Sequence, residues 1–511
     1  MSSSSLTENL VLRLSGITRR FGPVVANEGV DLELRRGEVL ALLGENGAGK
    51  TTLMNILFGH YVADSGMIEV ARPDGGLTPL SPGNPRAALA AGIGMVHQHF
   101  TLADNLTVLD NILVGAESLW RLRSDRGGAR DRLTALIDRS GLSVDLDSPV
   151  SRLSVGERQR VEILKALYRD ARILILDEPT AVLTPQETEG LFAVLRRLVA
   201  DGLSVVFISH KLAEVMAISD RVTVLRGGRV VLNVDTAETD RARLAEAMVG
   251  RPVPPSIRTE REAGPPVLSI RNAAVGDRLH IDELTIHGGE IVGIAGVSGN
   301  GQRALSDLLA GLERPTAGEI ALFDRPVRRE TPAGMVAHGV GRVPEDRHRE
   351  GVVGEMTLWE NLILEDYRSK DSQRAGFLRR GAARDRAARV IEDYDVRCPG
   401  PDAEIRLLSG GNMQKLILGR ALGRAPGFVL ANQPTRGLDI GAVTEVHRRL
   451  LQARGDGAGI LLISEDLDEL LALSDRLSVI YQGRLTRTMK TEDVTIRDLG
   501  LMMAGQGADA A

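Results

Sequence analysis

The sequence predicts an α/β protein made of two tandem copies of one domain. Short apolar runs that suit buried strands alternate with amphipathic helical segments, the order typical of a largely parallel sheet. Several motifs occur twice, in the same order, at offsets of 252 to 255 residues. The length of 511 residues is also sufficient for two or more domains.

The repeated motifs give the domain limits. Residues 44–49, 153–156 and 179–180 recur as 296–301, 408–411 and 434–435. We place the first domain at residues 10–250 and the second at 267–505. Residues 251–266 contain five prolines and mixed charge without periodicity, and we interpret them as a linker.

The elements of the first domain follow from short-range patterns. Apolar runs at 39–43, 173–176 and 205–209 predict three buried strands, and a glycine loop and a helix follow the first of them. Between the second and third strands, Thr184 and Glu187 have the spacing of a capping box. They predict a helix that starts there and runs to about Ala200.

Composition and charge exclude several classes. The formal net charge of −5 offers no global electrostatic case for nucleic-acid binding. The single cysteine, Cys398, excludes an internal disulfide and a cysteine-rich zinc module, and indicates a reducing compartment. We find neither a signal-peptide pattern nor a run of about 18 apolar residues, so action at a membrane is expected to go through partner chains.

A phosphate-binding loop is predicted in the first domain. Residues 44–51 match GxxxxGK[ST] between a strand and a helix, which is the context that this motif requires. Its glycines let backbone N–H groups converge on phosphate oxygens, and the helix N-terminus adds positive charge. Lys50 would neutralise the β- and γ-phosphates, and the Thr51 hydroxyl would ligate Mg²⁺. The predicted nucleotide-binding residues are Gly44, Glu45, Asn46, Gly47, Ala48, Gly49, Lys50, Thr51 and Thr52.

Polar residues follow the neighbouring strands at the end where α/β sheets bind ligands. Asp177 is predicted to hold the metal ion and Glu178 to activate the attacking water as general base. His210 is placed to contact the γ-phosphate, and Gln98 is a candidate for Mg²⁺ and water. An acidic surface turn and a structural histidine are the alternatives for the first three residues.

A further motif leads to a family. Residues 153–157, LSVGE, open a helix whose N-terminus can bind an anion, with Ser154 as its cap. Together with the loop at 44–51, Gln98, the run ILILDE at 173–178 and His210, this motif resembles those of the ABC ATPases. The resemblance implies in each half a RecA-like P-loop core, an antiparallel β subdomain and a helical subdomain.

The same resemblance has consequences for nucleotide binding. It implies that the halves pair head to tail, within one chain or between two, with each ATP between one half's Walker loop and the other's signature. It also implies that Phe21 matches the aromatic residue that stacks on adenine. A phenylalanine of the hydrophobic core is the alternative.

The second half lacks the chemical groups of the first. Gln302 and Arg303 replace the lysine and threonine of the loop, Asn432 and Gln433 replace the acidic pair, and Glu465 and Glu345 stand at the positions of His210 and Gln98. We expect no hydrolysis at this loop.

Its signature, however, has the unmodified family form at Ser409, Gly410 and Gly411, whereas the first half carries Val155 in place of a glycine. Head-to-tail pairing therefore predicts one competent site, with the second signature beside the first Walker set, and one degenerate site.

The sequences of these motifs are similar to those of the energising subunits of bacterial nucleoside and simple-sugar importers. Asn432-Gln433 favours the nucleoside branch. This resemblance implies MgATP hydrolysis at the cytoplasmic face of the membrane, with two transmembrane permease subunits, an extracellular solute-binding lipoprotein and no nucleic acid. The alternatives are a simple-sugar importer, a soluble tandem ABC ATPase acting on ribosomes or DNA, and a nucleotide-binding regulator without turnover.

One charged segment remains. Residues 368–389 contain eight basic and two acidic residues. We interpret them as a solvated helical face, with a nucleic-acid or lipid-headgroup patch as the alternative.

Overall fold

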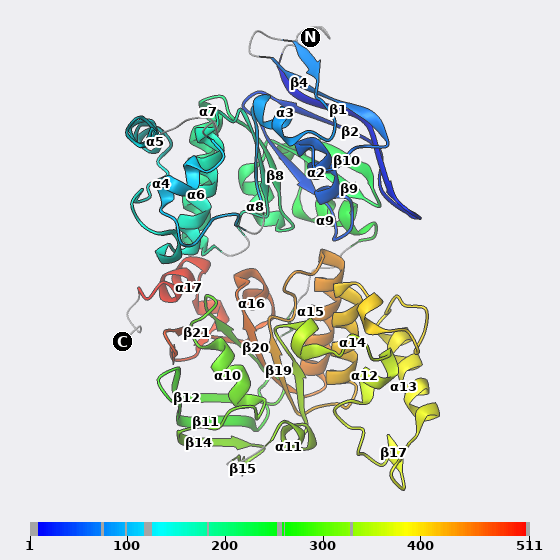
Figure 1. Ribbon diagram of the computed structural model, residues 1–511. Helices are drawn as coiled ribbons and strands as arrows, with labels where there is room; N and C mark the ends of the chain where they lie inside the picture. The colour runs from blue at the N-terminus through cyan, green and yellow to red at the C-terminus, as the bar shows by residue number, and fades with distance from the viewer. Residues whose placement is uncertain are drawn as a thin grey trace. The chain divides into compact units, whose positions relative to one another are not determined.

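The chain divides into two compact units, Met1–Val253 and Pro254–Ala511. Figure 1 shows the computed structural model, in which each unit combines sheets with helices. The structure describes residues 9–72, 76–97, 100–116, 125–180, 183–252, 258–259, 261–327 and 331–506. Within these ranges, no helix has both the length and the apolar character needed to cross a bilayer.

The core of the first unit is a six-stranded sheet of order β10-β9-β3-β8-β7-β6. All neighbours pair in parallel except the edge pair β10–β9. The central strands are buried along almost their whole length, and β8 lies between β3 and β7, so the carboxyl ends of these three strands share one edge. The strands are β3 (Val39–Leu43), β6 (Ile93–Val96), β7 (Ile173–Asp177), β8 (Ser204–Ile208), β9 (Arg221–Arg226) and β10 (Arg229–Asp235).

A second, antiparallel sheet of order β2-β1-β4-β5 belongs to the same unit. Its buried residues Leu12 and Leu34 share one hydrophobic core with Leu53 and Leu57 of α2 and with Leu40 of the parallel sheet. The sheet therefore provides the predicted antiparallel β subdomain. Its strands are β1 (Leu10–Phe21), β2 (Val24–Arg35), β4 (Ser65–Ala71) and β5 (Leu77–Pro79).

Two helices of the first unit start where the capping signals predict. Ser154 caps α6 and Thr184 caps α7. Each hydroxyl accepts the N–H of the glutamate three residues later, and each N-cap backbone N–H donates to the carboxylate of that glutamate. Helices α4, α5 and α6 pack on one another and form the helical subdomain. The helices are α2 (Lys50–Phe58), α3 (Pro85–Ala90), α4 (Val108–Leu113), α5 (Arg126–Ser140), α6 (Val155–Tyr168), α7 (Pro185–Ala200), α8 (Leu212–Ile218) and α9 (Arg241–Val249), with 3-10 turns η1 (Val150–Arg152) and η2 (Thr236–Glu238).

The second unit repeats this topology. Its strands β22-β21-β13-β20-β19-β16 follow the order of the first unit, which confirms the predicted duplication. One parallel bridge between His280 and Arg484 joins them to the antiparallel strands β15-β14-β11-β12 in a single eleven-stranded sheet. The strands are β11 (Pro266–Val275), β12 (Leu279–His287), β13 (Ile291–Ala295), β14 (Ala317–Leu322), β15 (Arg325–Pro326), β16 (Val340–Val343), β19 (Phe428–Asn432), β20 (Gly459–Ser464), β21 (Arg476–Tyr481), β22 (Arg484–Leu485) and β23 (Met489–Lys490), with a separate pair, β17 (Gln373–Arg374) and β18 (Phe377–Leu378).

The second unit also has a helical subdomain, in which α12, α13 and α14 pack together. The helices are α10 (Gln302–Leu309), α11 (Pro332–Ala337), α12 (Leu358–Ile363), α13 (Arg380–Asp393), α14 (Gly410–Leu422), α15 (Ile440–Gly455), α16 (Leu467–Leu473) and α17 (Ile496–Met503), with a π-helical turn η3 (Arg347–Gly351) and 3-10 turns η4 (Ile405–Leu407) and η5 (Thr491–Asp493).

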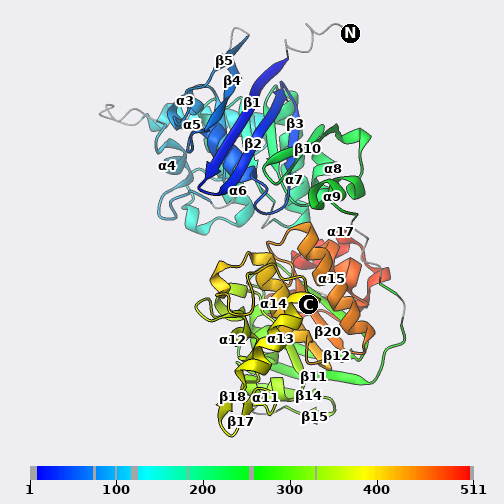
Figure 2. The same cartoon turned by 90° about the vertical axis from the view of Figure 1, so that its right-hand side faces the viewer.

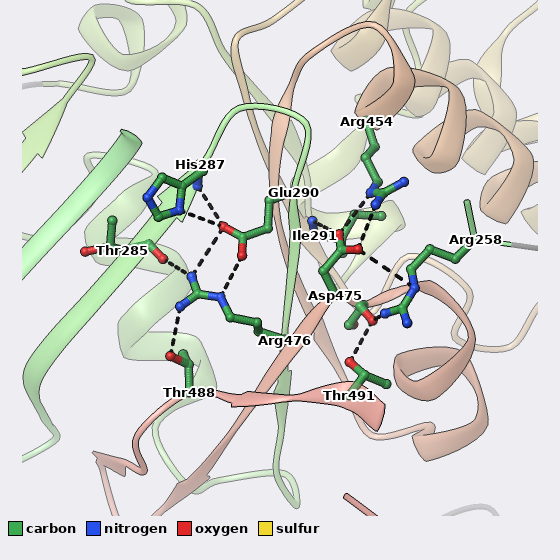
Figure 3. A network of polar contacts seen from close by, with 11 residues as sticks. Arg258, Thr285, His287, Glu290, Ile291, Arg454, Asp475, Arg476, Thr488 and Thr491 are labelled. Atoms are coloured by element: carbon green, nitrogen blue, oxygen red, sulfur yellow. Dashed lines mark hydrogen bonds and ion pairs between the residues drawn. The ribbon is translucent and has the colours of Figure 1, made fainter. Parts of the chain in front are cut away.

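A polar network fixes the start of the central strand in each unit. In the second unit, Glu290 pairs with Arg476, and Asp475 accepts bonds from the Ile291 N–H at 2.8 Å and from Arg454 (Figure 3). Although burial raises the pKa of Glu290, its bonds to Arg476 and to the His287 backbone hold that pKa below its ordinary value. Arg258, from the predicted linker, bonds the Ser474 carbonyl and lies 3.8 Å from Asp475.

The first unit contains the same network in a more buried form. Arg221 makes two bonds to the Glu38 carboxylate, at 2.8 and 3.2 Å, and both side chains are less than a tenth exposed. The Val39 N–H donates to Asp220 at 2.8 Å, as Ile291 does to Asp475. The duplicated network ties the base of β3 to β9.

Because Arg221 would be left as an uncompensated buried charge, we expect Glu38→Ala to lower the free energy of unfolding by about 3–5 kcal/mol. Glu33→Ala is the matched control, since Glu33 pairs with Arg13 at 3.1 Å on the surface and is half exposed. That change should cost no more than about 1 kcal/mol. Urea unfolding of both variants measures the difference, and equal shifts would contradict a structural role for the Glu38 pair.

Candidate active site

The loop of residues 44–49 joins β3 to α2 and requires glycine at both ends. A Cβ on Gly44 would lie 2.4 Å from the Leu225 carbonyl oxygen, and one on Gly49 would lie 2.2 Å from that of Ala26. Gly49 is also the N-cap of α2 with φ of 101°, a left-handed conformation that favours glycine. The first turn of α2 contains no acidic residue, so its positive dipole is not offset there.

Two polar side chains hold this loop in shape. The buried Lys50 ammonium donates to the carbonyl oxygens of Gly44 at 2.6 Å and Glu45 at 3.0 Å. Asn27, a fully buried residue of β2, donates its side-chain N–H to the Gly49 carbonyl at 3.2 Å. The sequence analysis did not identify Asn27, because a single asparagine in a strand has no signal that distinguishes it.

The acidic pair and the histidine meet beside the loop. Glu178 follows β7 with φ of 48°, and its N–H donates to the Ile208 carbonyl at 2.9 Å. His210, which follows β8, places Nδ1 3.0 Å from Glu178 Oε1. The hydrogen bond from His210 holds the pKa of Glu178 below its ordinary value against the effect of burial, and the Lys50 charge acts in the same direction. Glu178 is therefore an ionised carboxylate at neutral pH.

The pKa of Asp177 is shifted in the opposite direction, above its ordinary value. Burial raises its pKa, the Glu178 charge raises it further, and Lys50 and His97 oppose both effects. A cation bound next to Asp177 would offset this penalty, because opposite charge favours the ionised form. The sequence analysis did not identify His97, which directly follows β6.

The residues here fit a magnesium ion that is bound together with phosphates. Mg²⁺ prefers oxygen ligands and commonly takes one or two from the protein and the rest from phosphates and water. The Asp177 carboxylate and the exposed Thr51 hydroxyl are such oxygens. Within the ranges that the structure covers, no three or more His, Cys, Asp or Glu side chains form a metal-binding group. Gln98 lies outside the described residues.

Phe21 ends β1 and is 41% exposed, which contradicts the core alternative. Its ring meets Tyr61 edge-on at 5.7 Å, and the Arg19 guanidinium lies 4.8 Å from its centre. Because Arg19 pairs with Asn27 across β1 and β2, Phe21 lies on the hairpin that holds the phosphate loop.

The corresponding loop of the second unit keeps the backbone but not the charges. Gln302 Nε2 donates to the Val297 carbonyl at 2.7 Å, where the first unit has Lys50 bonded to Glu45. Gln433 keeps the left-handed backbone of Glu178, with φ of 50° and an N–H bond to the Ile463 carbonyl at 2.8 Å. The buried Asn432 replaces Asp177.

Charged residues near this loop pair with one another. Arg303 lies 3.6 Å from Asp307 and 3.8 Å from Glu350. Arg436 donates to Glu345 at 2.6 Å and counteracts the burial that raises the pKa of Glu465. The second unit thus has neutral amides, Gln302 and Gln433, at the positions of Lys50 and of the general-base candidate Glu178.

The two signature helices differ in charge at their N-termini. In α6, the Glu157 carboxylate accepts the Ser154 N–H at 2.8 Å, and this bond lowers its pKa, so a negative charge sits in the first turn. In α14, Ser409 caps the helix and accepts from the Asn412 side chain at 3.0 Å, with no acidic residue in the first turn. Only the second signature keeps its full helix-dipole potential.

Two further residues increase this difference. Val155 is 40% exposed at the first signature. At the second, Arg347 Nη2 lies 3.0 Å from the place of a Gly410 Cβ, and its Nη1 donates to the Arg436 carbonyl at 2.7 Å. The matching position in the first unit, counted from β6 and β16, is Phe100.

The fold and this loop-centred site define a P-loop protein with a degenerate second copy. The family model described as "ABC transporter" matches residues 27–181 and 279–436. The chain belongs to the ABC transporter family and is an ATPase of that family.

Curated relatives align with nearly its whole length. The glucose import ATP-binding protein TsgD13 of Haloferax volcanii is 44% identical and covers 98% of this chain and 97% of its own. The nucleoside import ATP-binding protein NupA of Lactococcus lactis is 42% identical and covers 98% of this chain and 99% of its own. The guanosine import ATP-binding protein NupO of Bacillus subtilis is 43% identical over 97% of each chain.

Solved structures share the tandem fold at lower identity. The structure described as RNase-L Inhibitor has a TM-score of 0.63 and 22% identity, and covers 96% of this chain and 93% of its own. An archaeal ribosome recycling factor has a TM-score of 0.62 and 21% identity over 94% and 90%. This likeness shows the fold alone.

Proposed function

We propose that the chain is the ATP-hydrolysing subunit of an importer for nucleosides. The observation that carries the proposal is the difference between the units. The first combines Lys50, Asp177, Glu178 and His210, whereas the second has uncharged amides at the first three of these positions and Glu465 at the fourth. The nucleoside and guanosine import relatives, and Asn432-Gln433 in the second copy, favour nucleosides. A simple-sugar importer is the second candidate, favoured by the glucose and ribose import relatives.

The catalytic site is completed by the signature of the second unit, paired head to tail with the first Walker set within one chain or between two. The supporting observation is electrostatic. The N-terminus of α14 carries no acidic residue and has Arg347 beside Gly410, whereas that of α6 carries Glu157. A γ-phosphate is stabilised by the first arrangement and repelled by the second.

In this site, the loop amides and Lys50 bind the β- and γ-phosphates, and the exposed Phe21 ring stacks on the adenine. Asp177 and Thr51, with Gln98, would hold Mg²⁺, which supplies positive charge to the phosphates. Water attacks the γ-phosphorus in line while the bond to the β,γ-bridging oxygen breaks. Glu178 accepts the proton of that water, and His210 orients the Glu178 carboxylate through its hydrogen bond.

Coupling to transport requires other chains. We propose two transmembrane permease subunits and an extracellular solute-binding lipoprotein as partners, with the ATPase at the cytoplasmic face of the membrane. In this arrangement the permease carries the solute, and closure of the nucleotide site moves the permease. The solute is then selected by the partners rather than by the residues described above.

The test is reconstitution of the chain with its permease and binding-protein partners in proteoliposomes. We expect binding protein loaded with guanosine to stimulate ATP hydrolysis and guanosine uptake, with Glu178→Gln as the inactive control. Stimulation by ribose or glucose alone would select the second candidate. Stimulation by ribosomes or DNA, with none by any solute, would refute import.

A further inference from the structure

A short hairpin in the second unit has no part in the nucleotide site. Strands β17 and β18 pair Arg374 with Phe377 across a two-residue turn, in which Ala375 and Gly376 have φ of 52° and 86°. Positive φ at both central residues is the mark of a type I′ turn, which matches the twist of a hairpin. Figure 2 shows β17 and β18 at an outer end of the second unit.

The base of the hairpin is fixed to the helical subdomain. The Ser372 hydroxyl donates to Asp366 at 3.4 Å, and its carbonyl accepts the Arg379 N–H at 2.9 Å. Asp366 in turn pairs with Arg386 of α13 at 2.7 Å, and both side chains are largely buried. The hairpin is therefore held in one position and presents its tip in a defined direction.

The tip exposes apolar side chains. Phe377 is 80% exposed, the largest value among the exposed large hydrophobic residues of the described chain, and Leu378 beside it is 43% exposed. Tyr367, 45% exposed, lies at the start of the same segment. A rigid hairpin that keeps a phenylalanine and a leucine in water gains nothing for its own fold, and clustered exposed apolar groups commonly mark an interaction surface.

Exposed basic residues flank this tip along the chain. Lys370, Arg374, Arg379 and Arg380 are all exposed, and among the residues that the structure describes none of the four has an ion pair within 4 Å. By contrast, Arg384 in the same segment is paired with Asp402 at 2.8 Å. The hairpin region thus carries a local positive charge, although the net charge of the whole chain is −5.

We propose that this hairpin binds the surface of a membrane that contains anionic phospholipids. Phe377 and Leu378 enter the boundary between headgroups and acyl chains, and the four cations bind the headgroup phosphates. A lipid surface fits better than a nucleic acid, because Leu378 cannot stack on a base, whereas apolar side chains beside cations suit the boundary between headgroups and acyl chains. The hairpin would give the ATPase a contact with the bilayer that is independent of its protein partners.

The test is flotation of the purified full chain with vesicles of phosphatidylcholine, alone or mixed with phosphatidylglycerol. We expect binding to the mixed vesicles only, with loss at high salt. Because each cation near an anionic surface strengthens binding by about fivefold, Arg379→Glu/Arg380→Glu should weaken it by at least about 25-fold. Phe377→Ser should weaken it by about tenfold.

The matched control is Arg241→Glu/Arg243→Glu, which makes the same charge change in the first turn of α9. This control should bind mixed vesicles like the parent chain, and all variants should keep their basal ATPase rate. Equal binding to both vesicle types, no binding to either, or an equal loss in the control would overturn the proposal. So would tighter binding of single-stranded DNA than of vesicles, if Arg379→Glu/Arg380→Glu removed it.

Discussion

Replacing Glu178 by glutamine is expected to lower ATP hydrolysis by about 10²–10⁴-fold and to leave ATP binding intact. The amide can still accept the hydrogen bond that joins Glu178 to His210, so the local geometry should persist. It cannot accept the proton of the attacking water. The loss therefore falls on turnover, because Lys50 and the loop amides, which we propose bind the phosphates, are unchanged.

Binding is measured by titration with ATP, and turnover by phosphate release from the chain together with its membrane partners. The matched control is Gln433→Glu, which places a carboxylate on the same backbone conformation in the second unit. It should not restore hydrolysis to Glu178→Gln, because Gln302 and Asn432 remain at that loop. Near wild-type turnover by Glu178→Gln would refute the assignment of the general base.

The parts of this site that could be predicted from the sequence are those in which residue type dictates backbone geometry. The glycines of the loop at 44–49 and the capping box at Thr184 both belong to this group. Asn27 could not be predicted, because its contact with Gly49 depends on how β2 lies against the loop. The same holds for the bond between His210 and Glu178, which joins the ends of two strands.

The charge difference between the two signature helices could be predicted only in part from the sequence. The spacing of Ser154 and Glu157 is that of a capping box, yet its consequence appears only when the carboxylate is placed in the first turn of α6. Arg347 lies far from Gly410 along the chain, and only the fold brings them together. In the same way, one bridge between His280 and Arg484 decides that the second unit has a single merged sheet.

The other large effect on ATP hydrolysis is expected from substitutions of the serines that cap the two signature helices. We expect Ser409→Arg to abolish ATP hydrolysis, because a long side chain at the N-cap of α14 would block the approach of the helix amides to the γ-phosphate. We expect Ser154→Arg to have a much smaller effect. In the proposed head-to-tail pairing, that signature faces the loop next to Gln302, where no turnover is expected, and it already carries Val155 and Glu157.

The two substitutions are matched, since each replaces an N-cap serine that makes the equivalent bond in its own unit. Loss of either cap should cost about 1 kcal/mol of stability, so folding must be confirmed for both variants by circular dichroism and thermal unfolding. A difference in ATPase rate between two folded variants then reports on the site and not on stability.

The ATPase rate of Ser409→Arg against Ser154→Arg, with solute uptake measured in parallel, is the most direct test of the single composite site. The predicted result is complete loss in Ser409→Arg and substantial activity in Ser154→Arg. Equal loss in both would mean that the degenerate site must also close around nucleotide before the competent one can fire. Loss in Ser154→Arg with a tolerated Ser409→Arg would contradict the head-to-tail assignment.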